Sequence, residues 1–455
     1  MAAVVKNKDY IVDITDINHE GQGVGRIDGF TVFVDGALVG ENVKVKIIKV
    51  LKSHAVGKLL EIKIPSTARI EPFCPAYKRC GGCSLQHMSY GAQLEYKTRM
   101  VKEVLKRIGK IGNAESLVRD TMGMEHPFEY RNKAQYPVGT AEEKPVIGFY
   151  ARRSHDIVNV EHCGIHETLG NKIREIFRKF IEENNISVYD ETSHKGLVRH
   201  LMIRSGFRTG EIMVVVVING QDLPRKKALV DSLLGQVPGI KSIVLNINTE
   251  KTNVILGEKN LVIYGNDAIT DYIGDLKFYI SPLSFFQVNP VQAEVLYNKA
   301  VEFAALSGNE TVFDLYCGTG TIALFMARKA KQVYGVETVG EAIADAKRNA
   351  KVNGIGNVEF LEGEVEEIVP KLYDAGIKAD VVVVDPPRKG CEVSVLDTVA
   401  NMAPARIVYV SCNPATLARD LFYLGERGYG TVEVQPVDMF PWTAHVECVV
   451  LITKL

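Results

Sequence analysis

Three short segments in the last third of the chain carry side chains that could do chemistry together. They are VVVDPPRKG at 382–390, VSCNPATLARD at 410–420 and HVE at 445–447. They place Asp385 beside a Pro-Pro turn, Cys412 in a tight Asn-Pro turn, and Glu447 near the C-terminus. A lone thiol with a carboxylate base suits covalent catalysis followed by proton removal.

A glycine-rich turn upstream predicts a cofactor site. VFDLYCGTGTIAL at 312–324 reads as a strand, a turn at Gly318 and Gly320, and a helix. Glycine there permits a sharp turn and close approach of a ligand, and Glu337 ends the next strand, where it could bind a ribose diol. NAD is the alternative ligand, but the position of the loop and the later Asp-Pro-Pro turn favour S-adenosylmethionine. Arg388 stands where amine methyltransferases carry an aromatic residue, which leaves carbon as the methyl acceptor.

Methylation of a pyrimidine carbon explains why a thiol and a base would be needed together. C5 of uracil is a poor nucleophile, but thiolate addition at C6 makes C5 enolate-like, so that it can attack the methylsulfonium of the cofactor. A base must then remove the C5 proton so that the thiolate is eliminated. Cys412 and Glu447 are the candidates, against the alternatives of a buried structural cysteine and an ordinary edge-strand glutamate. A uracil inside folded RNA would also have to be extruded.

The elements that position these residues divide the chain into three expected domains. Alternating apolar and polar residues over 1–63 predict a small antiparallel barrel of a kind that commonly binds oligonucleotides, with a purely structural barrel as the alternative. Residues 64–290 predict an α+β domain with an antiparallel sheet, because its strands lack intervening helical patterns of βαβ length. Strands alternate with helices over 291–455, which predicts a doubly wound α/β domain with a mostly parallel sheet.

Composition is that of an ordinary globular protein with a net charge of −1. No apolar run is long enough to span a bilayer, and the N-terminus lacks a signal-peptide pattern, so we expect a cytoplasmic protein without a membrane partner. A monomer is the default expectation. The segment 96–110 predicts a helix whose basic face includes Lys97, either for RNA or simply solvated.

Four of the eight cysteines lie outside the C-terminal third of the chain. Disulfides are not expected in the cytoplasm. Cys74, Cys80 and Cys83 form the pattern C-x5-C-G-G-C, and Cys163 follows far downstream in EHCGIH. Four thiolates could hold zinc or an iron–sulfur cluster. The nearby His87 and His162 are expected to pack rather than to bind metal.

DLYCGTGT, DPPRKG, SCNPATLARDL and HVE together resemble the motifs of the RNA uracil-5-methyltransferases, in the branch that acts on 23S ribosomal RNA. The resemblance extends over essentially the whole chain. It implies an N-terminal TRAM barrel, a central domain with a cysteine cluster, and a Rossmann-like catalytic domain that uses S-adenosylmethionine.

The resemblance also implies roles for particular residues. Cys412 would be the nucleophile and Glu447 the base. The residues that would contact S-adenosylmethionine are Gln287, Tyr316, Glu337 and Asp385, with Thr321 and Glu364 as further candidates. The four cysteines Cys74, Cys80, Cys83 and Cys163 would hold a [4Fe-4S] cluster, with zinc as the alternative. The usual Pro-His-Thr of the family is Pro441-Trp442-Thr443 here, and Trp442 is expected to pack against apolar neighbours rather than stack on an RNA base.

Two other functions compete with 23S rRNA methylation. The same reaction on tRNA is one, although that branch is expected to lack both the barrel and the cysteine cluster. An RNA-binding iron–sulfur protein without catalysis is the other, which intact Cys412 and Glu447 argue against. The candidates for phosphate contacts, each equally compatible with a structural role, are Arg131, Lys133, Arg199 and Arg204.

Overall fold

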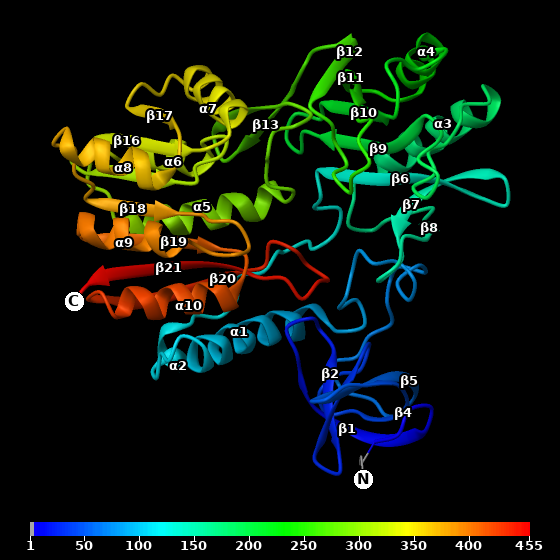
Figure 1. Cartoon of the computed structure of the whole chain (residues 1–455), viewed down its shortest axis with the longest axis horizontal. Helices are drawn as coiled ribbons and strands as arrows, with labels where there is room; N and C mark the ends of the chain where they lie inside the picture. The colour runs from blue at the N-terminus through cyan, green and yellow to red at the C-terminus, as the bar shows by residue number, and fades with distance from the viewer. Residues whose placement is uncertain (1–3) are drawn as a thin grey trace.

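The computed structural model describes residues 4–455, so residues 1–3 of the expected barrel lie outside it. The first strands close into a barrel in the order β1-β2-β3-β5-β4 (Figure 1). Their bounds are β1 Asp9–Ile17, β2 Gly23–Ile27, β3 Phe30–Val34, β4 Asn42–Val50 and β5 His54–Ile64. Alternate side chains such as Val32, Val43 and Val45 fill the interior, which confirms the barrel. The expectation of a wholly antiparallel barrel was wrong, because β3 and β5 pair in parallel.

The central sheet has seven strands in the order β12-β11-β10-β9-β6-β7-β8. The strands are β6 Lys133–Ala141, β7 Lys144–Tyr150, β8 Ile157–Asn159, β9 Val198–Ser205, β10 Ile212–Ile218, β11 Ile240–Ile247 and β12 Lys259–Gly265. Helices α3 (Thr168–Glu183) and α4 (Lys226–Gln236) pack on one face. Residues of the other face, including Met213 and Val215, join the core of the C-terminal domain.

The prediction of an antiparallel central sheet was wrong at one pair of strands. β10 and β11 are parallel, and α4 provides the crossover between them. Only Leu229 and Leu233 of α4 are buried. The helix therefore has no apolar stripe that would distinguish it from a loop in the sequence.

The C-terminal sheet has the order β17-β16-β15-β18-β19-β21-β20. Its strands are β15 Thr311–Leu315, β16 Gln332–Glu337, β17 Val358–Glu362, β18 Val381–Val384, β19 Arg406–Ser411, β20 Tyr429–Val437 and β21 Glu447–Lys454. The first five strands of this order are parallel, whereas β21 and β20 are antiparallel to their neighbours. This confirms the doubly wound domain.

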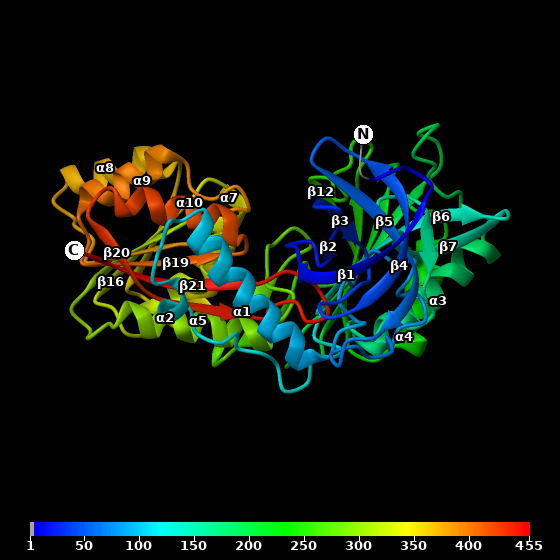
Figure 2. The same ribbon diagram turned by 90° about the horizontal axis from the view of Figure 1, so that it is seen from below.

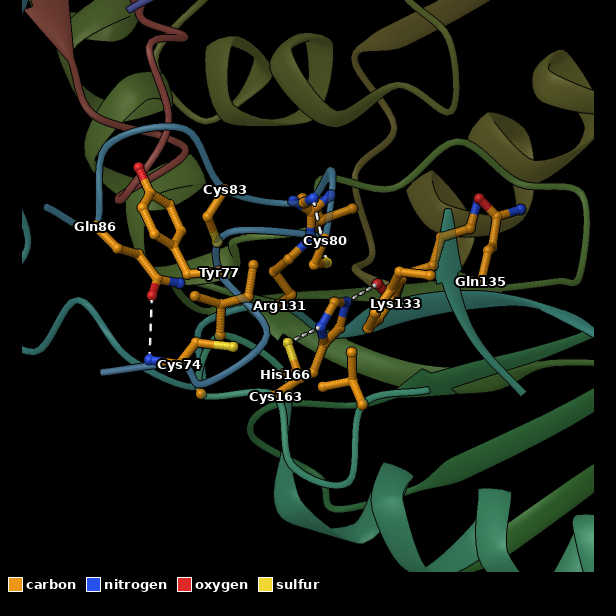
Figure 3. A pocket seen from close by; sticks show the side chains of 16 residues that line it. Cys74, Tyr77, Cys80, Cys83, Gln86, Arg131, Lys133, Gln135, Cys163 and His166 are labelled. Carbon is orange, nitrogen blue, oxygen red and sulfur yellow. Dashed lines mark hydrogen bonds between the residues drawn. The ribbon is translucent and has the colours of Figure 1, made fainter. Parts of the chain in front are cut away.

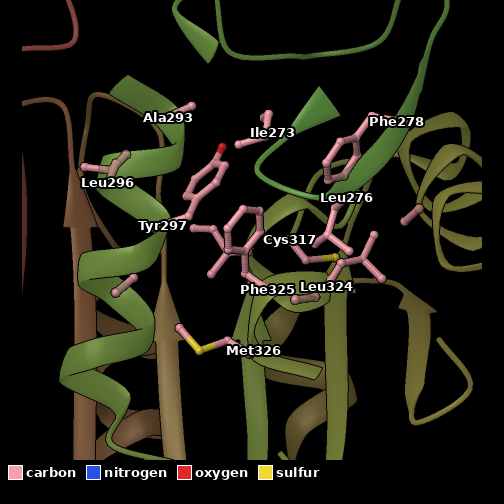
Figure 4. Packing of buried hydrophobic residues seen from close by; sticks show 14 of the residues in the cluster. Ile273, Leu276, Phe278, Ala293, Leu296, Tyr297, Cys317, Leu324, Phe325 and Met326 are labelled. Atoms are coloured by element: carbon pink, nitrogen blue, oxygen red, sulfur yellow. The ribbon is translucent and has the colours of Figure 1, made fainter. Parts of the chain in front are cut away.

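Helices cover both faces of this sheet. They are α5 Pro290–Ala304, α6 Thr321–Ala327, α7 Gly340–Val352, α8 Val365–Asp374, α9 Val393–Met402 and α10 Pro414–Gly425. Val381 and Val383 point into the core with α5, α6 and α7, while Val382 and Val384 point into the core with α8, α9 and α10. A strand buried on both faces explains the run of four valines. Figure 4 shows the first core, where α5 and α6 meet the hairpin of β13 (Ile269–Ile273) and β14 (Leu276–Ile280).

Helix α1 (Tyr90–Arg107) lies far from the central sheet and packs beside α10 and β20, together with the short α2 (Ala114–Leu117) (Figures 1 and 2). Val101 and Leu105 of α1 enter the same core as Leu417. The predicted basic face does not include Lys97, which is fully buried with its Nζ 2.5 Å from Asp438. Within residues 4–455, no helix has the length and apolar character needed to cross a bilayer.

Candidate active site

The glycine-rich turn between β15 and α6 has the geometry of a ligand loop. Tyr316, Gly318 and Gly320 all adopt positive φ angles, of 67°, 53° and 79°. A Cβ on Gly320 would meet the Phe360 ring at 2.7 Å, so packing requires glycine there. A Cβ on Gly318 would meet nothing within 4 Å, so the space beside this residue is open. The turn therefore packs against the protein at Gly320 and leaves free space at Gly318, which is what a loop that contacts a ligand requires.

Glu337 lies across this turn, at the end of β16. One carboxylate oxygen accepts the Gly318 N–H at 3.1 Å, and the other accepts the Thr338 N–H at 2.8 Å. Parallel pairing of β15 with β16 brings the two strand ends to the same edge of the sheet. Of the further candidates, Thr321 begins α6 directly after the turn, and Glu364 precedes α8 after β17.

Gln287 lies in the segment before α5, half-buried beside the same turn. The Thr319 hydroxyl donates to the Phe285 carbonyl at 3.2 Å, which ties this segment to the glycine-rich turn. Asn132 in turn donates its side-chain N–H to the Gln287 carbonyl at 3.0 Å. The predicted cofactor residues Gln287, Tyr316 and Glu337 therefore gather around one turn.

Asp385, Cys412 and Glu447 come together at the same edge of the sheet. Asp385 follows β18, Cys412 follows β19, and Glu447 begins β21. In the antiparallel pair of β19 and β21, Ser411 stands opposite Cys448, so Cys412 and Glu447 are the next positions in register. Three motifs spread over more than sixty residues of sequence thus meet because their strands are neighbours.

The pKa values of these three groups are all raised. Burial raises the pKa of Asp385 to about 7. Burial, and then the negative charges of Glu447 and Asp385, raise the pKa of the Cys412 thiol to about 11, while Arg388 opposes the shift. Burial and Asp385 also raise the pKa of Glu447 well above its ordinary value, again against Arg388. Carboxylates of raised pKa are stronger proton acceptors, which is the property that a general base needs.

The sequence did not single out Tyr297 of α5, which lies between the two halves of this site. Burial raises its pKa, Thr321 and Gln287 oppose the shift, and the charges of Asp385 and Glu447 add to it. Its ring packs in the apolar core with Phe325 (Figure 4). In the sequence Tyr297 matches a core position of an amphipathic helix, so no signal distinguished it.

Cys74, Cys80, Cys83 and Cys163 line one cavity of about 300 Å³ (Figure 3). All four are free thiols. Three come from the segment before α1, and Cys163 comes from the loop after β8. Across the described residues 4–455, no three His, Cys, Asp or Glu side chains gather closely enough to hold a single metal ion. The thiols therefore share a cavity without converging on one point.

One guanidinium and one amine lie in the wall of this cavity. Arg131 and Lys133 line it, and the Nε of Arg131 is buried without a hydrogen-bond partner. Burial, together with Arg204 and Arg131, lowers the pKa of Lys133 to about 7. Burial raises the pKa of Cys83 to about 12, with the three other thiols adding to the effect of burial. The cavity therefore brings four thiols together with the Arg131 guanidinium and the Lys133 amine.

The histidines near the cysteines divide into packing residues and one that the sequence analysis overlooked. His87 shares a 2.6 Å hydrogen bond with the Tyr77 hydroxyl, and His162 shares one of 3.1 Å with Asn171. His166 instead places its Nδ1 3.2 Å from the Cys163 sulfur. Its position three residues after Cys163 in EHCGIH was the available signal.

Two of the candidate phosphate contacts are structural. Arg199 donates to the carbonyls of Asn248 and Glu250 at 2.7 and 2.8 Å, and only 5% of its surface is exposed. Arg204 donates to the Ser284 carbonyl at 2.6 Å and is equally buried. Neither guanidinium is free to bind RNA. Trp442 is buried among Phe73 and Phe128, as apolar packing predicts.

The chain is similar to known RNA methyltransferases over its whole length. A family model described as tRNA (Uracil-5-)-methyltransferase matches residues 253–455, and a TRAM domain model matches residues 6–60. An uncharacterized RNA methyltransferase from Clostridium tetani is 55% identical over 99% of this chain and 97% of its own length. One from Caldanaerobacter subterraneus is 53% identical over the full length of both chains.

A solved structure aligns equally completely. The tRNA (uracil-54, C5)-methyltransferase of Pyrococcus abyssi, in complex with S-adenosyl-L-homocysteine, covers 98% of this chain and 100% of its own, with a TM-score of 0.79 and 28% identity. The fold and the comparisons define an S-adenosylmethionine-dependent RNA methyltransferase with a TRAM domain. The chain belongs to the RNA uracil-5-methyltransferase family. Because this tRNA enzyme covers 98% of the chain, the expectation that the tRNA branch typically lacks the barrel does not separate the two branches.

Proposed function

We propose that this enzyme methylates C5 of a uridine in 23S ribosomal RNA, with Cys412 as the nucleophile and Glu447 as the base. The observation that carries the proposal is the meeting of Cys412, Glu447 and Asp385 at one strand edge, beside the glycine-rich turn. A thiol, a carboxylate of raised pKa and a cofactor loop are what methylation of an unreactive pyrimidine carbon requires. The cysteine motif resembles that of the family branch that acts on 23S ribosomal RNA, and this resemblance supports the ribosomal substrate.

The steps follow from the chemistry of the side chains. The Cys412 thiol gives up its proton to water, and its sulfur adds to C6 of the uracil, which moves the electrons of the C5–C6 double bond toward C5 and O4. S-adenosylmethionine supplies the methyl group to C5, and Gln287, Tyr316, Glu337 and Asp385 would hold it. Glu447 then takes the C5 proton, the double bond re-forms, and the bond from C6 to the Cys412 sulfur breaks. Arg388 opposes the rise in the pKa values of both groups, which favours the thiolate of Cys412 and the carboxylate of Glu447.

We also propose that Cys74, Cys80, Cys83 and Cys163 hold a [4Fe-4S] cluster. A single zinc ion would need all four sulfurs about 2.3 Å away, whereas these thiols surround a cavity of about 300 Å³. The cations Arg131 and Lys133 on the wall suit an anionic cluster. Because methyl transfer requires no electron transfer, the role of the cluster would be to order the protein or to position RNA.

The domain organisation suggests which part of the chain binds RNA and which part carries out the reaction. We propose that the barrel at 1–63 binds RNA, that 64–290 forms the central domain, and that 291–455 is the catalytic domain. The enzyme would act in the cytoplasm as a monomer. A tRNA substrate is the second candidate, and the Pyrococcus structure favours it because that tRNA enzyme matches the entire chain.

Labelled S-adenosylmethionine tests the proposal directly. The protein is incubated with unmodified 23S rRNA or with unmodified tRNA, and the methylated nucleoside is identified by mass spectrometry. 5-Methyluridine in the rRNA alone is the expected result. The same product in tRNA alone keeps the chemistry and overturns the substrate, and a different methylated nucleoside overturns the roles of Cys412 and Glu447. Cys412→Ala serves as the control for background methylation.

A further inference from the structure

The connection between β20 and β21 leaves the catalytic sheet and reaches the cysteines. We call residues 438–446 the β20–β21 loop and residues 74–85 the cysteine loop. Figure 1 shows the β20–β21 loop, in red, extending from the sheet toward the central strands. The Trp442 carbonyl accepts the N–H groups of both Ser84, at 3.0 Å, and Leu85, at 2.9 Å. The Ala444 N–H donates to the Ser84 hydroxyl at 3.0 Å. Ser84 directly follows Cys83, so these bonds attach the β20–β21 loop to a thiol-bearing segment.

The Trp442 side chain reinforces this attachment. Only 4% of its surface is exposed, and its ring centre lies 5.1 Å from that of Phe73 and 5.2 Å from that of Phe128. Its indole N–H donates to the Pro127 carbonyl at 2.6 Å. Trp442 belongs to the apolar cluster that contains Cys83, and Cys74 and Cys163 pack against that cluster. The tryptophan is therefore part of the packing that supports the cysteine cavity.

The backbone at Trp442 is held in an unusual conformation. Its φ angle is 68°, in the left-handed region that residues other than glycine adopt only when their surroundings fix them. The Gln93 side chain accepts the Trp442 N–H at 3.0 Å and donates to the Leu85 carbonyl at 3.2 Å, which closes a bridge between the two loops. A conformation that depends on these partners will relax when they move.

Glu447 stands at the far end of the same loop. The loop begins at Asp438, where Lys97 and Tyr90 of α1 fix the carboxylate at 2.5 and 2.9 Å. It is attached to the cysteine loop at Trp442 and Ala444, and it re-enters the sheet at Glu447. Only two residues separate Ala444 from Glu447, so a shift of the attachment is transmitted to the carboxylate.

We propose that Trp442 is a positioning residue: through it, the cysteine loop fixes the position of the Glu447 carboxylate. This inference rests on the proposed role of Glu447 as the base. A disturbance of the cysteine cavity would then slow removal of the C5 proton. The hydrogen bonds of Ser84 and Trp442 include no residue of the glycine-rich turn, so a change at these two residues should leave cofactor binding there unaffected. The specific consequence is accumulation of the covalent adduct between Cys412 and RNA, since the adduct forms normally and resolves slowly.

Ser84→Ala tests the attachment without touching a thiol. It removes the hydroxyl that accepts the Ala444 N–H, and we expect turnover to fall about fivefold, the equivalent of one net hydrogen bond. The KM for S-adenosylmethionine should be unchanged, and the fraction of enzyme trapped on RNA should rise. Ser84→Thr, which keeps the hydroxyl, should restore turnover. Ser116→Ala is the matched control, because the Ser116 hydroxyl bonds only the Asn113 carbonyl on α2. If Ser84→Ala behaves like Ser116→Ala, or loses turnover without trapping RNA, the proposal is overturned.

Trp442 reports on its own environment because it is the only tryptophan of the chain. In Cys83→Ser we expect its fluorescence maximum to move to longer wavelength and its quenching by acrylamide to increase. Cys391→Ser, a buried cysteine outside the cavity, should leave both unchanged. Identical emission from Cys83→Ser and the wild type would contradict the coupling.

The two proposals fail in different ways. If the wild type makes no 5-methyluridine and Glu447→Gln traps no RNA, the proposed function fails. If both of those results are positive while Ser84→Ala and Cys83→Ser behave as the wild type, only the positioning role of Trp442 fails. Iron and sulfide analysis of the wild type tests the cluster separately.

Discussion

The sheet edge and the cysteine cavity gather the reactive side chains of this chain in opposite ways. At the sheet edge, Asp385, Cys412 and Glu447 each stand at the end of a strand, and hydrogen-bonded neighbours bring them together. In the cavity, Cys163 meets the other three thiols without any strand pairing between them. At the sheet edge, the order of the strands is enough to position the side chains. In the cavity, the positions of the thiols depend on contacts between loops and on any group bound there.

The two regions also differ in charge. The sheet edge collects carboxylates whose pKa values are raised, with Arg388 as the opposing cation. The cavity collects thiols against Arg131 and Lys133. The first arrangement suits proton transfer and the second suits holding an anionic group. The proposed chemistry therefore takes place at the sheet edge, and the proposed role of the cavity is to support it.

The largest expected loss of turnover follows removal of the Cys412 thiol at the sheet edge. Cys412→Ala should reduce formation of 5-methyluridine by about four orders of magnitude or more and abolish the RNA adduct, because it removes the nucleophile. Cys391→Ala, at a buried thiol near the same strands, should keep turnover within a few-fold of the wild type. Both variants are assayed with labelled S-adenosylmethionine. Residual turnover of Cys412→Ala near the wild-type rate would contradict the assignment.

The raised pKa of Cys412 predicts a strong pH dependence. Because only the thiolate is alkylated and the pKa is about 11, the rate of iodoacetamide alkylation should rise about tenfold per pH unit between pH 7 and 10. Mass spectrometry of the Cys412 peptide gives this rate. In urea-unfolded protein the same peptide should level off above about pH 8.5. A plateau near pH 8 in the folded enzyme would show that neither burial nor the carboxylates raise the pKa of this thiol.

Two glycines of the cofactor turn distinguish ligand space from packing. Gly318→Ala places a methyl group in the open space, so S-adenosylmethionine affinity should fall about tenfold, while the positive φ angle lowers the free energy of unfolding by about 1 kcal/mol. Gly320→Ala meets the Phe360 ring, so its main effect should be a lower free energy of unfolding, by about 2 kcal/mol or more. Calorimetric titration and urea unfolding measure the two effects. If affinity and free energy of unfolding fell in the same proportion in both variants, Gly318 and Gly320 would not have the separate roles in ligand binding and packing that we assign to them.

The smallest expected effect on turnover is at the cysteine cavity. If the cavity holds the proposed cluster, Cys83→Ser should lower the iron content of the protein and reduce turnover about fivefold, since the proposed chemistry does not use the cavity. The melting temperature should also fall, because a group bound only by the folded state stabilises it. Iron analysis, thermal unfolding and turnover are compared with Cys391→Ser. Loss of turnover as complete as in Cys412→Ala would mean that the cavity takes part in the reaction.

Much of the sheet edge could be predicted from the sequence because each motif lies at one end of a strand. The valines of β18 and the turn after them fix the place of Asp385 by local rules, and parallel order brings Cys412 beside it. To place Glu447 beside Cys412, the only further condition is that β21 pairs with β19. The barrel followed in the same way from its period-two alternation, although the parallel pairing of β3 with β5 did not, since alternation carries no strand direction.

Contacts between distant segments could not be predicted from the sequence. Lys97 sits in a lysine-rich segment and was expected at the surface, yet it is buried because Asp438, more than three hundred residues away, pairs with it. Arg204 resembled a phosphate contact until the Ser284 carbonyl proved to be its partner. Helix α4 was missed because only two of its side chains are buried. For Lys97 and Arg204 the deciding partner lies far away in the sequence, outside the local pattern.

The account rests on Cys412 and Glu447 acting on the same uracil in two separate steps. Glu447→Gln should therefore form an RNA adduct that survives denaturing gel electrophoresis, carries the labelled methyl group, and maps to Cys412. The double variant Cys412→Ala with Glu447→Gln should form none. A methylated adduct in the single variant alone is the result that the account predicts. Free 5-methyluridine released by Glu447→Gln at the wild-type rate, with no adduct, would contradict it.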